Sequence, residues 1–439
     1  MNMGVLMHTT LDGTQCPGGV AGRLRRANPP GMMQAQFRAG QSSGRLSQLE
    51  GLRGLAAMMV VAWHFIWAFA PWQLGSVAGL PTSGMVGSPV AASIDGPAAV
   101  ALFFVLSGFV LPLGLFRSGR VRTAIQAAAK RWLRLAGLSV VAVLSCYALF
   151  RLDLFRYREA AGLTGSTWLG SYGGGDPTGR FVPSLTGALS EGLIGAFVWN
   201  SDAYNPVLWT MRHELFGSFV SIGAVLATLC VPRWACRCIL ALLVVLVPLA
   251  DPWLIPFLVG TGLAFLVWRY GARLGPGAAA LSIVTGLFLF GYLEPTGAYA
   301  GIPVIQDSAG YRYDRILVHT LSALLILLGL IGNEEASRVL RTGPLLLLGR
   351  LSFPIYLFHF PLMCSLACGL FFIFHGRVPY GVGLMLVAAI YLPVVLLLAV
   401  LFARVDEAWG AWVNRFTDRL LTWGIGLARV WRPRCRGTS

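Results

Sequence analysis

The sequence predicts an all-α integral membrane protein, a polytopic helical bundle of about ten transmembrane helices. Of its 439 residues, 56% are hydrophobic and only 12% are charged, a balance far to the apolar side of soluble globular chains. A helix needs about 20 mostly apolar residues to cross the roughly 30 Å hydrocarbon core of a bilayer. Windows of that kind follow one another with no soluble-sized interval between them, which indicates a single membrane domain.

Ten such windows can be placed to within a few residues. They cover residues 51–70, 97–115, 132–150, 207–230, 237–250, 253–269, 277–293, 315–332, 352–374 and 381–403. The fifth is short and the sixth begins with prolines, so this pair alternatively forms a tight hairpin or a broken helix. The windows predict a membrane domain over residues 46–408, between a disordered basic cytoplasmic tail of residues 1–45 and a basic cytoplasmic tail of residues 409–439.

The distribution of positive charge orients these helices. The net charge is +16, and arginines gather between alternate spans, whereas the loop of residues 71–96 holds no Lys or Arg. Because cytoplasmic loops are enriched in Lys and Arg, an even number of spans with both termini in the cytoplasm fits every interval. The basic balance is therefore explained by topology, and no nucleic-acid partner is expected. We expect a multi-pass protein of a bacterial cytoplasmic (inner) membrane.

The eight cysteines do not indicate a disulfide framework or a metal site. They are scattered, none falls in a loop assigned to the outside, and none has the His or carboxylate partners of a metal site. We expect Cys236, Cys238, Cys364 and Cys368 to be small buried residues, and we expect no metal.

An arginine and a histidine on the first span are the first candidates for chemistry. Arg53 and His64 are separated by ten residues. Eleven steps of about 100° return to within about 20° of the start, so both side chains point the same way, about 16 Å apart along the axis. Histidine titrates near neutrality, which suits a general base for a hydroxyl. The alternatives are a structural histidine bonded to a carbonyl and an ordinary cytoplasmic arginine.

A basic cluster opens the third span on the side predicted to be cytoplasmic. It contains Arg131 and Arg134 within Lys130-Arg-Trp-Leu-Arg134. Cations in that place suit the phosphates of a nucleotide-like donor. Alternatively, the cluster serves only as a topology signal.

The fourth span carries a glutamate that ionises unfavourably in a bilayer unless it is paired or hydrated. Glu214 follows Trp209 in the segment Trp209-Thr-Met-Arg-His-Glu214 and lies about 10 Å into the span from its outer end. The same count places His64 at nearly the same depth, so we predict that Glu214 orients His64. Alternatively, Glu214 pairs with Arg212 or Arg53 as a structural lock.

A polar stripe is predicted on the ninth span. Ser352, Tyr356 and His359 are spaced i, i+4 and i+7, so they share one face of an otherwise apolar helix. Ser352 alternatively acts only as a helix cap before Pro354.

These groups occur in an order that resembles the acyltransferase-3 family of membrane O-acyltransferases. The resemblance covers about residues 46–408 and rests on five blocks: Glu50-Gly-Leu-Arg53-Gly through His64, Phe103-Phe-Val-Leu-Ser107-Gly108-Phe109, the basic cluster, Trp209 to Glu214, and Leu351-Ser352-Phe-Pro-Ile-Tyr356-Leu-Phe-His359. The chain departs from the family where Thr210 replaces the usual serine and where Asp406-Glu407-Ala-Trp lacks a proline. No departure removes an ionisable residue.

The resemblance implies ten spans and transfer of an acyl group, with acetyl from acetyl-CoA as the first expectation, to a hydroxyl of a carbohydrate. Cell-surface polysaccharides and lipid-linked sugars are the expected acceptors, and a few family members modify macrolides. No bound cofactor is expected; acyl-CoA is the donor substrate, and membrane lipids surround the bundle. The expected roles are catalytic for His64 and Glu214, donor-binding for Arg53, Arg131 and Arg134, and supporting for Trp209, Ser352, Tyr356, His359 and Ser107.

Two other classes of protein remain open from the residues alone. A secondary transporter or flippase uses buried Arg, His and Glu as a proton relay, although no internal repeat is visible in this sequence. A membrane scaffold or sensor uses buried polar residues only to hold helices together.

Overall fold

The computed structural model describes residues 44–75, 85–176, 178–307 and 312–430. The expected N-terminal tail of residues 1–45 lies outside this range except for its last two residues, as do residues 431–439 of the expected C-terminal tail. Helices dominate the described residues, whose only β feature is an isolated bridge between Gln306 and Arg312. The all-α class is confirmed.

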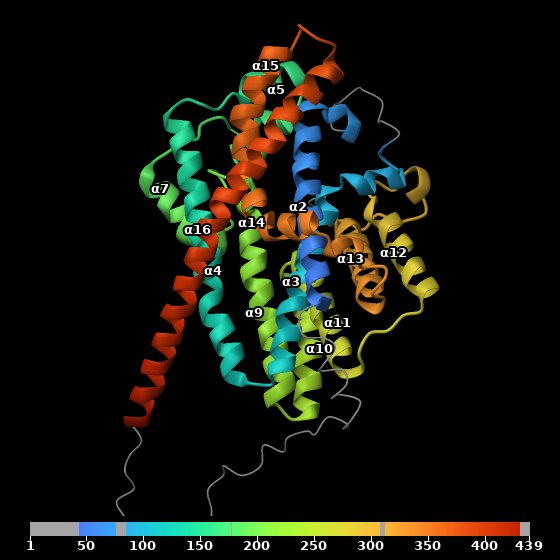
Figure 1. Cartoon of the computed structure of the whole chain (residues 1–439), viewed down its shortest axis with the longest axis vertical. Coiled ribbons are helices and arrows are strands. Elements are labelled where there is room, and N and C mark those ends of the chain that lie inside the picture. Colours follow the sequence, from blue (N-terminus) through green and yellow to red (C-terminus); the bar gives the residue numbers. More distant parts are fainter. Residues whose placement is uncertain (1–43, 76–84, 177, 308–311, 431–439) are drawn as a thin grey trace, which may run out of the picture. The chain divides into compact units, whose positions relative to one another are not determined.

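Eleven helices of the described residues form the bundle (Figure 1). They are α2 (Gly44–Phe69), α3 (Gly96–Ser118), α4 (Val121–Arg151), α9 (Trp209–Cys230), α10 (Arg233–Ala250), α11 (Ile255–Tyr270), α12 (Pro276–Phe290), α13 (Tyr313–Gly332), α14 (Gly343–Leu362), α15 (Cys368–Phe374) and α16 (Tyr380–Val430). A π-helical segment, Met363–Ala367, joins α14 to α15. Four short helices lie between α4 and α9: α5 (Tyr157–Thr164), α6 (Thr167–Gly170), α7 (Leu185–Ser190) and α8 (Ala196–Val198).

Nine helices in the described ranges are long and apolar enough to cross a membrane, so the multi-pass prediction is confirmed. The predicted seventh span is the difference, because α12 has 15 residues and a length of about 22 Å, short of the hydrocarbon core. Its chain turns after Phe290, where Tyr292 and Tyr299 are buried and the Tyr299 hydroxyl donates to the carbonyl of Phe288 at 2.6 Å. The fifth and sixth windows form two separate helices, α10 and α11. The orientation, with both termini in the cytoplasm, stays a prediction.

Close helix packing joins α3 and α11. Gly108 on α3 lies against the backbone of Phe257, and Gly260 on α11 lies against the backbone of Val105 and Gly108. A Cβ atom at either glycine would overlap main-chain atoms of the other helix. Small residues allow such approach, which supplies van der Waals packing between membrane helices. This close approach fixes the position of Ser107 beside α9, where its hydroxyl donates to Glu214 at 2.7 Å.

The segment between α4 and α9 packs onto the ends of α2 and α14. Ser166 donates to the carbonyl of Trp67 at 2.7 Å, and the Arg156 amide donates to the carbonyl of Cys364 at 2.9 Å. The end of α2 and the π-helical segment after α14 are thus tied to the same segment, in which Trp168 stacks on Trp67 of α2 with ring centroids 4.6 Å apart.

We expect Gly108→Val to destabilise the protein, since the added methyl groups meet main-chain atoms of α11 that cannot move aside. Overpacking of this kind costs about 1–3 kcal/mol or more. Gly114→Val on the same helix is the matched control, because no atom lies within 4 Å of a Cβ there. Thermal unfolding of both purified variants tests this; equal melting temperatures would contradict close α3–α11 packing.

Candidate active site

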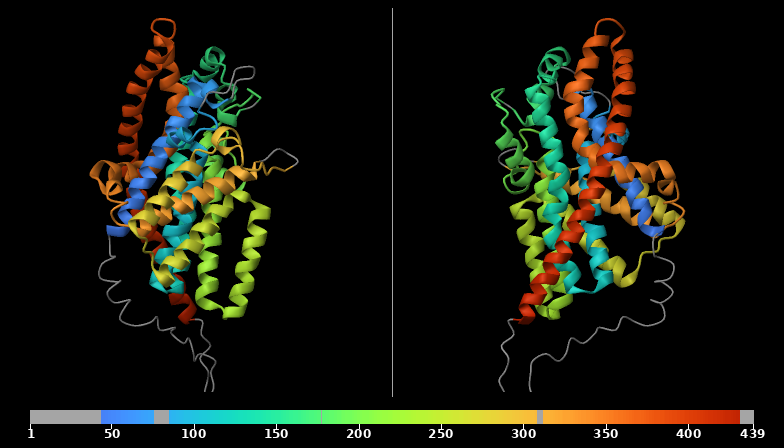
Figure 2. Two further views of the ribbon diagram at one scale, coloured as in Figure 1. Left: turned by 90° about the vertical axis from the view of Figure 1, so that its right-hand side faces the viewer. Right: turned by 60° about the vertical axis from the view of Figure 1, so that its left-hand side comes forward.

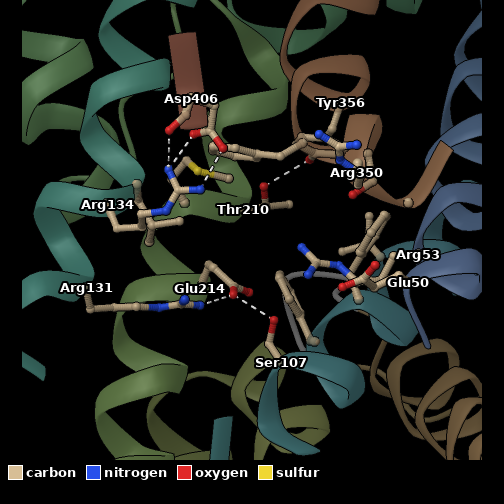
Figure 3. A pocket seen from close by; sticks show the side chains of 18 residues that line it. Glu50, Arg53, Ser107, Arg131, Arg134, Thr210, Glu214, Arg350, Tyr356 and Asp406 are labelled. Carbon is tan, nitrogen blue, oxygen red and sulfur yellow. Dashed lines mark hydrogen bonds and ion pairs between the residues drawn. The ribbon is translucent and has the colours of Figure 1, made fainter. Parts of the chain in front are cut away.

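Most of the predicted donor-binding and supporting residues line one pocket of about 350 Å³ (Figure 3). Side chains from α2, α3, α4, α9, α14 and α16 meet there. The polar lining residues are Glu50, Arg53, Ser107, Arg131, Arg134, Thr210, Glu214, Arg350, Ser352, Tyr356 and Asp406. Arginines and carboxylates thus gather between helices that are otherwise apolar, where unpaired charge is costly.

Glu214 is held on one side of the pocket by α3 and α4. The Arg131 guanidinium forms an ion pair and hydrogen bond with its Oε1 atom, and the Ser107 hydroxyl donates to the same oxygen at 2.7 Å. Arg131 also donates through Nε to Ser218 at 2.7 Å. This leaves the second terminal nitrogen of Arg131 without a hydrogen bond to any described residue, so it retains N–H donors for a ligand.

A second arginine is held by a carboxylate from the last long helix. Arg134 donates to both oxygens of Asp406, at 2.6 and 2.7 Å, and to its carbonyl at 3.0 Å. Bidentate pairs of this kind fix the plane of the guanidinium. Arg350, at the exposed rim, donates to Glu407 at 2.7 Å. The roles of Asp406 and Glu407 as partners of these arginines were not predicted, although the pair was visible as the acidic block after the last apolar window.

Arg53 differs from these arginines because it has no such partner. Figure 3 shows its guanidinium reaching into the pocket from α2, near Glu50 of the same helix. Among the described residues, no hydrogen bond or ion pair holds Arg53 in place, and its side chain is exposed to the pocket. It is therefore free to bind an anion with its full set of donors.

His64 and His359 form a hydrogen-bonded pair, and neither histidine lines this pocket. The distance from Nδ1 of His64 to Nε2 of His359 is 2.7 Å, and Nδ1 of His359 lies 3.1 Å from the carbonyl of Ile355. Because a carbonyl only accepts, the neutral His359 ring carries its proton on Nδ1, and its Nε2 is the acceptor. His64 then donates through Nδ1, which leaves the lone pair on its Nε2 atom. No described residue bonds to that atom.

Aromatic rings fix the plane of His64. Its ring stacks on His359 with centroids 5.0 Å apart and on Trp168 with centroids 5.1 Å apart. Trp168 in turn stacks on Trp67 at 4.6 Å, and Phe360 meets His64 edge-on. Trp168 belongs to the loop after α4, so sequence reasoning, which considered only residues at membrane depth, passed over it.

The predicted contact between His64 and Glu214 is wrong. Glu214 is bound by Arg131 and Ser107, and His64 is bound by His359. Both residues were placed at one depth by counting from the outer ends of their spans, and that count does not determine which side chains meet across the bundle. Neither Arg212 nor Arg53 forms an ion pair with Glu214, whose ion-pair partner is Arg131. Arg212 lies 3.6 Å from Asp251 instead.

The predicted stripe on α14 is divided between the two parts of the site. Ser352 and Tyr356 line the pocket, whereas His359 joins His64. The Tyr356 hydroxyl donates to the carbonyl of Val207 at 2.9 Å and lies 3.0 Å from the Thr210 hydroxyl. Trp209 does not line the pocket and packs instead on Trp253 and His213. Within the described ranges, no group of three His, Cys, Asp or Glu side chains is placed to hold a metal ion.

A known protein family matches most of the chain. The family model described as an acyltransferase domain, that of the acyltransferase-3 family, matches residues 46–404. No curated protein and no solved structure matches the chain. The matched range includes α2, α3, α4, α9 and α14, and with them every predicted site residue. The chain therefore belongs to the acyltransferase-3 family and is a multi-pass membrane acyltransferase.

Proposed function

We propose that the protein transfers an acyl group, with acetyl as the first candidate, from acyl-CoA to a hydroxyl of a carbohydrate. The observation that carries this proposal is His64, whose Nε2 atom has a free lone pair, on the same helix as Arg53, which lines a pocket with other arginines. A hydroxyl must lose a proton to attack a thioester, and an imidazole nitrogen is suited to accept it. The acceptor is a cell-surface polysaccharide or a lipid-linked sugar.

The pocket supplies the donor end of this reaction. Arg53 and the free terminal nitrogen of Arg131 offer N–H donors to the phosphates of CoA, while Arg134 is held in a fixed plane by Asp406. Arg53 and His64 lie on the same helix, about 16 Å apart along its axis. An elongated donor bound by its phosphates near Arg53 places its thioester toward His64, which explains why cations and base are separated.

The chemical step follows from the tautomer of the histidine pair. Nε2 of His64 takes the proton of the acceptor hydroxyl as its oxygen bonds to the thioester carbon. The carbon–sulfur bond then breaks, and the proton on His64 passes to the leaving thiolate, which gives the ester and free CoA. While His64 is protonated, its Nδ1–H donates to His359, so the neighbouring ring stabilises the positive charge. Transient attachment of the acyl group to His64 is the alternative route.

The acceptor end lies on the other side of His64 from the arginines in this proposal. Trp168 and Trp67 continue the stack of rings away from His359, and the predicted orientation directs this end outward. A donor made in the cytoplasm then modifies a sugar outside a bacterial cytoplasmic membrane.

We expect His64→Ala to lower transfer by about 10²- to 10⁴-fold, the usual contribution of a general base. His359→Ala leaves the base present and removes its orienting partner, so we expect a smaller loss. His359→Gln should recover part of that loss, because the amide oxygen accepts from Nδ1 of His64. Transfer of labelled acetyl from acetyl-CoA to glycan in membrane vesicles measures all three, with His375→Ala as the control. Full activity of His64→Ala contradicts the proposal.

Arg53→Gln should raise the KM for acyl-CoA about ten- to a hundredfold with little change in kcat, because charged hydrogen bonds to the donor are lost. Arg338→Gln is the control, since Arg338 is exposed and pairs only with Glu335. The two variants are compared in the same vesicle assay over a range of donor concentrations. An unchanged KM in Arg53→Gln, with normal membrane insertion, rules out Arg53 as a donor-binding residue.

A further inference from the structure

A second cavity, of about 570 Å³, lies between α3, α9, α10 and α11 and shares no lining residue with the candidate active site. Figure 2 shows α9 and α10 as a hairpin in yellow-green. This cavity forms a groove whose lining is mostly apolar and whose polar side chains are Thr228, Thr261, Arg233 and Arg237. No acidic side chain lines it.

The lining of the groove suits an apolar occupant. Its two threonine hydroxyls already donate to carbonyls, Thr228 to Ala224 at 2.8 Å and Thr261 to Phe257 at 2.8 Å. The remaining lining side chains away from the arginines are apolar or a thiol. Water inside would therefore find few partners, whereas a hydrocarbon chain fills such a space favourably.

The outer face of α10 indicates that the groove borders the lipid. Leu242 and Leu249, which do not line the groove, are 57% and 78% exposed, which in a membrane protein places them against acyl chains. Trp234, at the hairpin turn, is 72% exposed. Tryptophan and arginine at the end of an apolar helix are typical of the membrane–water interface. The turn between α9 and α10 thus lies at the level of lipid headgroups.

Two arginines place positive charge at the end of the groove nearest the turn between α9 and α10. Arg233 and Arg237 are one helical turn apart, both line the cavity, and neither has a hydrogen bond or ion pair with a described residue. From Arg233 to Val244 the groove extends about 16 Å along α10, which is about half of the hydrocarbon thickness. That is the depth of one leaflet.

We propose that this groove binds an anionic phospholipid, with its phosphate on Arg233 and Arg237 and one acyl chain between α9, α10 and α11. Charge complementarity selects the headgroup, and the length and apolar lining of the groove select the chain. The lipid fills the space that α10 leaves beside α11 and so fixes the hairpin to the bundle.

The test separates the headgroup from the chain. Wild-type protein and variants are reconstituted into bilayers of equimolar phosphatidylcholine and phosphatidylglycerol, extracted in mild detergent and analysed for retained lipid by native mass spectrometry. We expect Arg233→Gln/Arg237→Gln to lower retained phosphatidylglycerol about tenfold or more, since each arginine near an anionic lipid contributes about 1 kcal/mol. Gly262→Leu should lower it as well, because a Cβ at Gly262 meets open space and a leucine side chain fills the groove.

Matched controls keep the result independent of folding. Arg120→Gln/Arg122→Gln removes two exposed cytoplasmic arginines that do not line the groove, and Gly223→Leu adds a side chain to open space on α9 outside it. Both should retain lipid like the wild type, and circular dichroism checks that all variants keep their helices. The proposal is overturned if wild-type protein retains phosphatidylcholine as well as phosphatidylglycerol, if inorganic phosphate alone displaces the lipid, or if folded groove variants retain lipid undiminished.

Discussion

The hydrogen bond between His64 and His359 joins two helices, α2 and α14, that are 295 residues apart in the chain. It is the contact on which the proposed chemistry depends. One ring nitrogen of His359 is already committed to the carbonyl of Ile355 one turn earlier, so the direction of the shared proton is set by ordinary helical geometry. A single carbonyl thus determines which nitrogen of His64 is free. The stack with Trp168 then keeps that nitrogen from turning away.

The neighbouring pocket shows how several arginines are tolerated between apolar helices. Arg131 and Arg134 are each held by a carboxylate from another helix, Glu214 and Asp406. These ion pairs restrict the positions of the two guanidinium groups. They also link α4 to α9 and α16. Arg53 is left over, and its charge is the one that a bound anion would neutralise. These partly exposed pairs surround a pocket rather than the apolar core, and the cost of desolvating their charges offsets much of their attraction.

Much of the architecture could be predicted from the sequence, because each membrane span is recognisable as an apolar window of about 20 residues. The helical class, the order of the spans and the common location of Arg53, Arg131 and Arg134 follow from hydropathy, charge and spacing. Contacts between spans do not. The depth of Glu214 was counted from a loop whose level is set by tertiary packing, so its true partners on α3 and α4 were missed. Asp406 lies beyond the last apolar window, on a helix that continues to Val430, and hydropathy is silent about such an extension.

The proposed chemistry requires a free lone pair on the Nε2 atom of His64. Nitrogen-15 NMR of the ring-labelled protein shows directly which ring nitrogen carries the proton. The chain has six histidines, and the His64 signals are assigned by their loss in His64→Gln. We expect that His64 carries its proton on Nδ1, which donates to His359, and that its Nε2 atom is unprotonated. A spectrum in which Nε2 of His64 carries the proton would contradict it.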